Sequence, residues 1–293
     1  QELIDEDLAK ALLPQRPRAA HKGSCGRILV IAGSRGMTGA AAMCSLAALR
    51  AGCGIVTLAV PESLQPLLAV KLTEVMTKAI PEEEAGILGG KKAAEMLTAL
   101  SEDYDAVLIG PGLGRAVATG ELVRTLIKAV DKPLLLDADA IYALCEEPEL
   151  LREAKQVPVL TPHLGEMAGL LGLSVADLRE DLVGVARDAA AEYKAIFVLK
   201  SECTLVAYPD GHVYFTTKGN AGMATAGAGD VLAGTIAGLM KQMPAAKAPL
   251  LGVYLHGLAG DLADEEKAEG LIAGDILAQL PAARRSLQNQ GKK

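Results

Sequence analysis

"RILVIAGSRGMTGAAAMCSLAALRAGCGIVTLAVP", residues 27–61, combines two short apolar runs with an alanine- and leucine-rich stretch between them. The runs at 27–33 and 54–61 are apolar throughout, as expected for strands that are buried on both faces. The stretch at 39–52 has the apolar spacing of a helix. A strand, a helix and a strand in this order predict two parallel strands joined by a crossover helix.

The same alternation continues along the chain. Helical stretches such as 90–105 separate further apolar runs, which are "AVLIGPG" (106–112), "PLLLDAD" (133–139), "PVLTP" (158–162) and "AIFVLK" (195–200). The pattern predicts an α/β fold, a three-layer α/β/α sandwich with a mostly parallel sheet. "TLVAYPDGHVYFTT" (204–217) then predicts a hairpin around its turn residues. After it we expect only helices, at 229–241, 247–264 and 274–280.

Length and composition fit one domain. We expect residues 1–20 to form an N-terminal arm or helix on the main body, 21–285 a single catalytic domain, and 286–293 a flexible tail. The chain has 293 residues, and neither internal repeats nor a linker divide it.

Composition also excludes several classes of partner. A net charge of −7, no Trp and only two Phe offer no basic, aromatic surface for nucleic acid. No apolar window is long enough to span a membrane, and the charged N-terminus lacks the pattern of a secretory signal, so we expect a cytoplasmic protein. The cysteines are odd in number and form no C-x-x-C pair, which argues against a disulfide framework and a zinc site: Cys25, Cys44, Cys53, Cys145 and Cys203.

Open parallel sheets bind ligands beyond the carboxyl ends of their strands. Here the segments that follow the predicted strands are rich in glycine and polar residues: "AGSRGMTGA", "GPGLG", "DADA", "TPHLGE" and "KSECT". We therefore expect the active site at the sheet edge where these loops converge. The glycines of "GSRGMTG" (33–39) do not follow the G-x-G-x-x-G dinucleotide fingerprint, which disfavours a Rossmann dehydrogenase.

"NAGMATAGAGD" (220–230) is the strongest candidate for an anion site. Gly222 and Gly227 have the spacing of a Walker A loop, but Ala228 and Gly229 stand where that loop has Lys and Ser or Thr. A glycine turn followed by a helix start can still hold a phosphate through backbone N–H groups. Asp230 then has two interpretations, a helix cap or a general base that acts beside the bound phosphate.

Other single residues leave alternatives open. His163 follows a strand on the expected site edge and is either functional or structural, and Lys200 either reaches a nucleotide phosphate or extends into solvent. His256 fits a core histidine, His212 a solvated hairpin tip, and His21 lies near the first strand. No His, Cys or carboxylate pair has metal-cage spacing, so any metal would be Mg²⁺ brought with phosphates.

Taken in order, the motifs over about residues 20–282 resemble the NAD(P)H-hydrate dehydratase family, the ribokinase-like C-terminal half of bifunctional nicotinamide nucleotide repair enzymes. The resemblance is carried by "HKGSCGRILVIAGS", "MTGAA", "IGPGLG", "LLLDADAI", "LTPHLGEM", "VLKSECTLVAYPDG", "NAGMATAGAGDVLAG" and "YLHGLAGD". "NAGMATAGAGDVLAG" is the most diagnostic of them.

The resemblance implies ADP-dependent dehydration of (S)-NADHX or (S)-NADPHX to NADH or NADPH, with ATP as the donor in some members. The donor, with Mg²⁺, phosphorylates the C6 hydroxyl of the ring, and phosphate then leaves; ADP becomes AMP. Asp230 would be the catalytic base. The nucleotide-binding residues implied are Lys200, Ser201, Glu202, Cys203, Thr204, Asn220, Thr225, Ala226, Gly227, Ala228 and Gly229. The substrate-binding residues implied are Ala40, Gly112, His163, Leu164, Gly165, Glu166, Met167 and Asp230.

The chain departs from the family pattern at three positions. Ala228 stands where many members have Thr or Ser, Ser201 replaces a Gly, and Cys25 replaces an aromatic residue. The family also implies an NAD(P)HX epimerase as a functional partner, which is a separate protein or belongs to a longer chain. A homo-oligomer, such as a tetramer, is compatible with Gly234 and Gly238, which permit close helix packing within or between subunits.

Two rival functions fit the same residues. One is a ribokinase-like small-molecule kinase, such as a vitamin-precursor kinase, that releases its phosphorylated product. The other is a non-catalytic module that senses AMP or NAD.

Overall fold

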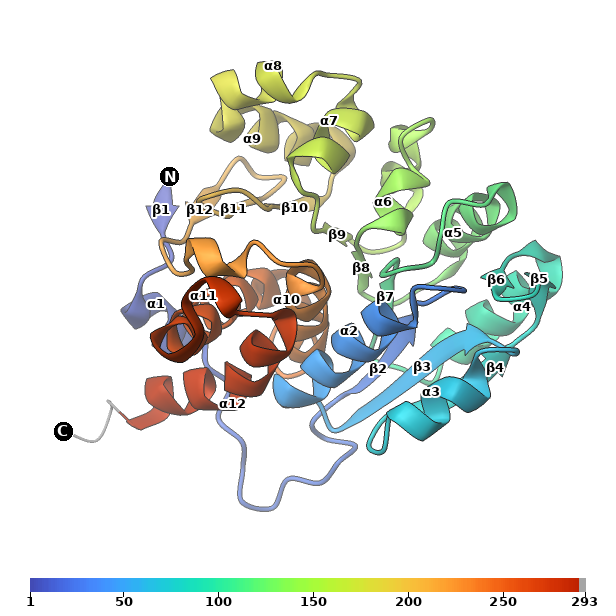
Figure 1. The fold of residues 1–293 in the computed structure, drawn as a ribbon. Helices are drawn as coiled ribbons and strands as arrows, with labels where there is room; N and C mark the ends of the chain where they lie inside the picture. The colour runs from blue at the N-terminus through green and yellow to red at the C-terminus, as the bar shows by residue number, and fades with distance from the viewer. Residues whose placement is uncertain (290–293) are drawn as a thin grey trace.

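The computed structural model describes residues 1–289, apart from the side chains of 266–268 and 289, and its centre is a ten-stranded sheet (Figure 1). In spatial order the strands are β1-β12-β11-β10-β9-β8-β7-β2-β3-β4, and β5 and β6 form a separate hairpin. The strand bounds are β1 (Glu2–Leu3), β2 (Arg27–Ile31), β3 (Ile55–Pro61), β4 (Met76–Ile80), β5 (Glu82–Glu84), β6 (Ile87–Leu88), β7 (Ala106–Ile109), β8 (Leu134–Leu136), β9 (Val159–Leu160), β10 (Ile196–Leu199), β11 (Leu205–Ala207) and β12 (Val213–Phe215).

Pairing in the sheet is parallel except at the predicted hairpin. There β10 pairs antiparallel with β11, and β11 with β12. The short strand β1 adds to β12 in parallel and was not expected from the sequence.

Helices cover both faces of the sheet, as the alternation of apolar runs predicts. They are α1 (Glu6–Leu12), α2 (Thr38–Arg50), α3 (Gln65–Lys71), α4 (Gly90–Ser101), α5 (Val117–Ala129), α6 (Asp139–Tyr142), α7 (Leu164–Leu171), α8 (Val175–Glu180), α9 (Leu182–Tyr193), α10 (Ala228–Leu239), α11 (Ala248–Lys267) and α12 (Ala273–Asn289). Short 3₁₀ turns lie at Pro148–Glu153, Ala221–Met223, Ala245–Lys247 and Ala268–Gly270.

Strand β2 shows why the sheet needs two helical layers. Ile28 and Val30 pack into the core under α2 and α10 to α12, whereas Leu29 and Ile31 pack into the core under α4, α5, α7 and α9. All four side chains are fully buried, and each contributes about 1.5–3 kcal/mol relative to exposure. The three-layer α/β/α fold is confirmed.

Helices α2 and α10 lie side by side although they are far apart in the sequence (Figure 1). A Cβ atom at Gly234 would overlap the carbonyl oxygen of Cys44, and one at Gly238 would overlap that of Ala48. These two glycines therefore serve packing within the chain. The contact fixes the start of α10 against α2.

The C-terminal helix is longer than the sequence suggests. We predict a helix over 274–280 and a tail from 286, but α12 passes through Pro281 and continues to Asn289. Leu287 is only 4% exposed, so its burial holds this end of the helix to the core. The remainder of the predicted tail, 290–293, lies outside the described residues. Among residues 1–289, no helix has the length and apolar character required to cross a membrane.

Candidate active site

The carboxyl ends of β2, β7, β8, β9 and β10 lie next to one another in the sheet. The five polar or glycine-rich segments follow these strands directly, so they meet at one edge, as predicted. Helix α10 begins at the same edge, because the Nζ atom of Lys200 lies 3.2 Å from the position of a Cβ atom at Gly229.

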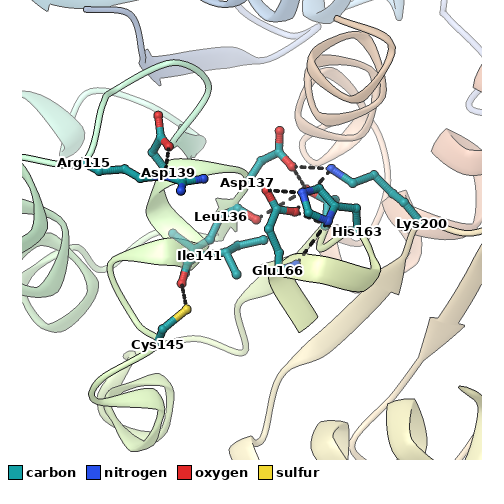
Figure 2. Close-up of polar contacts among 10 residues, drawn as sticks. Arg115, Leu136, Asp137, Asp139, Ile141, Cys145, His163, Glu166 and Lys200 are labelled. Atoms are coloured by element: carbon teal, nitrogen blue, oxygen red, sulfur yellow. Dashed lines mark hydrogen bonds and ion pairs between the residues drawn. The ribbon is translucent and has the colours of Figure 1, made fainter. Parts of the chain in front are cut away.

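Lys200 lies at the centre of a cluster of carboxylates (Figure 2). Its Nζ atom is 3.0 Å from Asp137 Oδ1 and 3.8 Å from Glu166 Oε2. Burial lowers the pKa of Lys200, but Asp137 and Glu166 raise it more, so the pKa lies above its ordinary value. Lys200 therefore points into the site as a cation, and the alternative of a solvent-directed amine is wrong.

Asp137 anchors this cation and is itself held firmly. Its carboxylate is 2% exposed and accepts a hydrogen bond of 2.6 Å from the hydroxyl of Thr161. Asp137 was not among the predicted site residues, although it opens the quoted "DADA" segment. Its position directly after a buried strand was the signal that could have identified it.

Asp230 lies in the first turn of α10 and does not cap it. The N-cap is Gly227, and no side chain makes a capping hydrogen bond there. Burial and the charge of Asp137 raise the pKa of Asp230 to about 7, although Lys200 opposes the shift. A carboxyl group with that pKa can take or give a proton near neutral pH.

The turn before α10 depends on one glycine in particular. Gly227 has a φ of +91°, and a Cβ atom there would lie 2.7 Å from the Met43 sulfur. Gly222 and Gly229 do not have positive φ values, so Gly227 alone of the three needs the left-handed conformation. Gly229 instead leaves space beside the Lys200 ammonium. The N–H groups of a first helical turn have no partner inside the helix and remain available to an anion.

Helix α11 supports this turn from behind. His256 Nε2 is 3.0 Å from the carbonyl oxygen of Ala228, and burial lowers the pKa of His256 to about 4, so the ring is neutral. Asp261 accepts hydrogen bonds from Gly219 N at 3.1 Å and from Asn220 Nδ2 at 3.4 Å. The sequence indicated only a core histidine at 256 and gave no role to Asp261.

Asn220 is held with one polar atom free. Its Oδ1 atom is buried and has no hydrogen-bond partner among the side chains and backbone that the structure describes. A buried acceptor without a partner costs about 1–3 kcal/mol. A donor group of a ligand would remove that cost, so Asn220 is suited to a binding role.

The substrate-side residues predicted in the first two loops are brought together. A Cβ atom at Gly112 would lie 3.0 Å from Ala40 Cβ and 2.9 Å from Met37 Cβ. Gly114 N donates to Asp139 Oδ2 at 2.8 Å, which ties the "GPGLG" loop to the "DADA" loop. Ala138, between the two aspartates, has a φ of +50°, a strained value for a residue other than glycine.

His163 has a structural role that the sequence left open. It is the N-cap of α7: its Nδ1 accepts from Glu166 N at 3.1 Å, while Glu166 Oε2 accepts from His163 N at 2.8 Å. The ring is 58% exposed and remains accessible to a ligand. Leu164 and Gly165 follow in the same turn, but the Met167 side chain is fully buried in the core and cannot contact a substrate.

The predicted nucleotide segment 201–204 forms the turn into β11. Ser201 Oγ donates to Cys203 O at 2.7 Å, and Cys203 Sγ donates to Thr216 O at 3.1 Å. Glu202 is paired with Arg179 at 2.9 Å and is 71% exposed, so its carboxylate is engaged outside the Lys200 cluster. On the other side of the site, Thr225 accepts a backbone hydrogen bond from Ala228, and Ala226 is exposed.

The three-layer α/β/α fold, with its candidate site at the start of α10, resembles that of ribokinase-like proteins. The solved structure of a ribokinase-like superfamily protein from Enterococcus faecalis covers 98% of this chain and 96% of its own, with a TM-score of 0.83 and 26% identity. The chain belongs more narrowly to the NAD(P)H-hydrate dehydratase family, whose model matches residues 28–282.

Two relatives bear related names. The bifunctional NAD(P)H-hydrate repair enzyme Nnr of Moorella thermoacetica is 44% identical over 290 residues, which are 98% of this chain but 54% of that protein. The chain thus spans about half the length of this curated relative. The solved structure of the ADP/ATP-dependent NAD(P)H-hydrate dehydratase from Bacillus subtilis, co-crystallized with ATP/Mg²⁺, has a TM-score of 0.83 and 30% identity, and each chain is covered to 98%.

Proposed function

We propose that the protein dehydrates (S)-NADHX and (S)-NADPHX to NADH and NADPH at the expense of ADP. The observation that carries this proposal is Asp230, whose pKa of about 7 suits a general base, in the turn that also presents free backbone N–H groups and faces Lys200. Membership in the NAD(P)H-hydrate dehydratase family supports the choice of substrate.

In this reaction Asp230 accepts the proton of the C6 hydroxyl while the hydroxyl oxygen attacks the terminal phosphorus of ADP. The bond from that phosphorus to the bridging oxygen breaks, and AMP leaves. The C6–O bond of the phosphorylated ring then breaks, and phosphate departs with the electron pair. The ring nitrogen supplies electrons to C6, and loss of a proton from C5 restores the double bond of the dihydronicotinamide.

The chain's contribution to phosphoryl transfer is mainly positioning and charge stabilisation. The backbone N–H groups of Ala226, Gly227 and Gly229, together with the Lys200 ammonium, would face the transferring phosphoryl group, whereas the N–H of Ala228 already donates to Thr225. Asn220 Oδ1, buried and without a partner among the described residues, would accept a hydrogen bond from the nucleotide. The other residues proposed to line the nucleotide are Ser201, Glu202, Cys203, Thr204 and Thr225.

The cation that accompanies the nucleotide is proposed to be Mg²⁺. Within the described residues no group of three or more His, Cys, Asp or Glu side chains is arranged to hold a metal ion. Mg²⁺ is therefore expected to bind mainly through phosphate oxygens and water, with at most one or two carboxylates, as this ion does in many phosphate sites. Asp137 and Glu166, the two carboxylates beside Lys200, are the candidate protein ligands of Mg²⁺.

The hydrated ring would lie along Ala40 and Gly112, with His163, Leu164, Gly165 and Glu166 on the opposite loop. Met167 would act only by fixing that loop in the core, since its side chain is fully buried. Loops from several strand ends would keep random water from the ring during elimination.

The decisive experiment is to incubate the protein with (S)-NADHX, ADP and Mg²⁺ and to follow absorbance at 340 nm together with AMP. We expect both to rise at equal rates. A stable phosphorylated product without NADH would favour the rival vitamin-precursor kinase. Nucleotide binding without any turnover would favour the AMP- or NAD-sensing module.

Replacing Asp230 by Asn separates catalysis from binding. Turnover should fall by about 10²–10⁴-fold, the usual worth of a general base, while ADP affinity stays close to that of the wild type. Unchanged turnover in D230N would refute the role of Asp230.

Three broader features are also proposed. An NAD(P)HX epimerase would supply the S epimer, as a separate protein or within a longer chain. The protein would act in the cytoplasm, which suits the free cysteines in the described residues. It would assemble as a homo-oligomer, a point that sedimentation or light scattering can test.

A further inference from the structure

A cavity of about 480 Å³ adjoins the substrate side of the site. Three segments that are distant in the sequence enclose it: the turn after β2, the tip of the β5–β6 hairpin and the loop after β7. Its lining includes Arg35 and Arg115, together with the acidic Glu84. Neither arginine belongs to the residues that the family resemblance implies.

The cavity lies next to the predicted ring site, because Met37 is common to both. Met37 lines the cavity and also lies against Gly112, where a Cβ atom would be 2.9 Å from Met37 Cβ. Nearly two turns further along α2, Met43 packs against Gly227. The six residues from Met37 to Met43 correspond to about 9 Å of helix. A ligand that begins at Asp230 and passes Ala40 would therefore continue toward the cavity.

Arg35 is held in place while its guanidinium stays unpaired. Its N–H donates to Gly86 O at 3.0 Å, and Gly86, with a φ of +82°, allows the hairpin tip to lie directly against the Arg35 Cβ. The nearby Glu82 carboxylate is occupied by Gly86 N at 2.9 Å and Ser63 Oγ at 2.8 Å. Among the described side chains none forms an ion pair with Arg35, although the charge of Arg35 contributes to the lowered pKa of Glu82.

Arg115, on the adjacent wall, is already partly engaged. Its Nε is 3.3 Å from Asp139 Oδ1 (Figure 2). Its guanidinium lies 4.2 Å from the centre of the Tyr142 ring. These contacts fix its orientation but leave other N–H groups free. Arg35 is therefore the principal cation of the cavity, and Arg115 adds to its field.

We propose that Arg35, assisted by Arg115, binds the diphosphate of the hydrated dinucleotide and so makes the chain specific for dinucleotides over the bare nucleoside. The inference rests on the proposed function, which puts the nicotinamide ring at Asp230. One ribose separates that ring from the diphosphate, and arginine recognises phosphate oxygens through paired N–H donors. Glu84, on the hairpin that lies against Arg35, is the acidic residue of the lining and opposes an anion there, whereas the two arginines attract it.

The test compares wild type with Arg35→Gln on three hydrated substrates, NADHX, NADPHX and hydrated nicotinamide riboside. For both dinucleotides we expect KM to rise about 10- to 100-fold in R35Q, with kcat and the KM for ADP nearly unchanged, because one charge-assisted phosphate contact is lost. For the riboside, which lacks phosphate, the two proteins should have equal kcat/KM. Arg35→Lys should recover part of the dinucleotide affinity.

Arg50→Gln is the matched control, since Arg50 is an exposed arginine at the other end of α2. An unchanged KM for NADHX in R35Q, or an equal loss for the riboside, would overturn the inference while turnover by wild type upholds the proposed function. A loss confined to NADPHX would assign Arg35 to the 2′-phosphate and overturn the diphosphate assignment. No turnover of NADHX by wild type would refute the proposed function itself.

Discussion

At the scale of single residues, Asp230 combines two opposing requirements. Burial and the charge of Asp137 raise its pKa to about 7, which suits a base but makes its charged form costly. Catalysis through Asp230 needs that charged form. The proposed function therefore predicts a specific dependence on pH.

We expect kcat/KM to rise with pH and to level off above about 7, because Asp230 loses its proton in that range. The measurement is initial rates at 340 nm between pH 5.5 and 8.5 at low NADHX. ADP affinity, measured over the same pH range, serves as the control for effects on binding. A flat profile across this range would argue against Asp230 as the base.

The same raised pKa predicts a cost in stability. Between the ordinary pKa of 3.8 and the folded value of about 7, the folded state holds a proton that the unfolded state has lost, so stability falls as pH rises through this window. Asp230→Asn removes the charge and should raise Tm at pH 8, by about 2–4 °C per kcal/mol relieved. Near pH 4 the two proteins should melt alike. An equal gain at both pH values would mean that the effect has another cause.

Lys200 lowers the pKa of Asp230 against the other contributions, which gives a third prediction. In Lys200→Met, the acid limb of the kcat/KM profile should move above pH 7, and KM for ADP should rise because the cation at the helix start is lost. K200R should keep the limb near its original position. The pH titration of residual activity checks this, and a limb that stays at pH 7 in K200M would contradict it.

At the scale of elements, the start of α10 depends on backbone geometry. Gly227→Ala places a side chain at a φ of +91° and against the Met43 sulfur, so it should destabilise the fold by about 1–3 kcal/mol and weaken ADP binding. Gly229→Ala is the matched variant, since its Cβ would meet only the flexible Lys200 ammonium. It should keep Tm near that of wild type and chiefly raise KM for ADP. Equal losses of stability in both variants would refute the distinction.

The elements that the sequence predicted well are those with a strong local pattern. Buried runs such as 27–33 and the hairpin turn at 209–212 carry their own signals, and both were confirmed. β1 and the β5–β6 hairpin escaped because their strands have only two or three residues, too few for a periodic pattern. The edge strand β4 also escaped, because only Ile80 of its five residues is buried and the run contains a lysine. α12 was predicted too short because Pro281 is typical of a helix end, whereas tertiary burial keeps the helix intact.

Within the site, sequence order located the loops but not the contacts between them. Three contacts hold the site together: Asp137 with Lys200, His256 with Ala228, and Asp261 with Asn220. The partners are 28 to 63 residues apart in the sequence, and no local pattern reveals such pairs. Met167 shows that a recognised motif can also name a residue that does not contact the ligand. It belongs to a recognised motif, yet its side chain is in the core, because a motif contains residues that fix the loop as well as residues that contact a ligand.

At the scale of the whole molecule, the sheet edge joins two helical layers that have separate cores. α10 and α11 pack on one face, while α7, which presents His163 and Glu166, packs on the other. Lys200 links them, since it contacts Glu166 and lies beside Gly229. A nucleotide bound there would contact elements from both layers, so it should stabilise the whole fold rather than one loop.

Saturation with nucleotide should therefore raise Tm as a single transition. At a ligand concentration of about 100 times Kd, the free energy of unfolding rises by about 2.7 kcal/mol. For domains of about 150–250 residues this gain corresponds to a Tm shift of roughly 5–11 °C. Differential scanning calorimetry with ADP and Mg²⁺, without NADHX, measures the shift. D230N should show the same gain, because Asp230 acts on the substrate hydroxyl, whereas K200M should show a smaller one. A shift confined to part of the unfolding transition would contradict the coupling of the two layers through this edge, and no shift at saturating ADP would contradict nucleotide binding there.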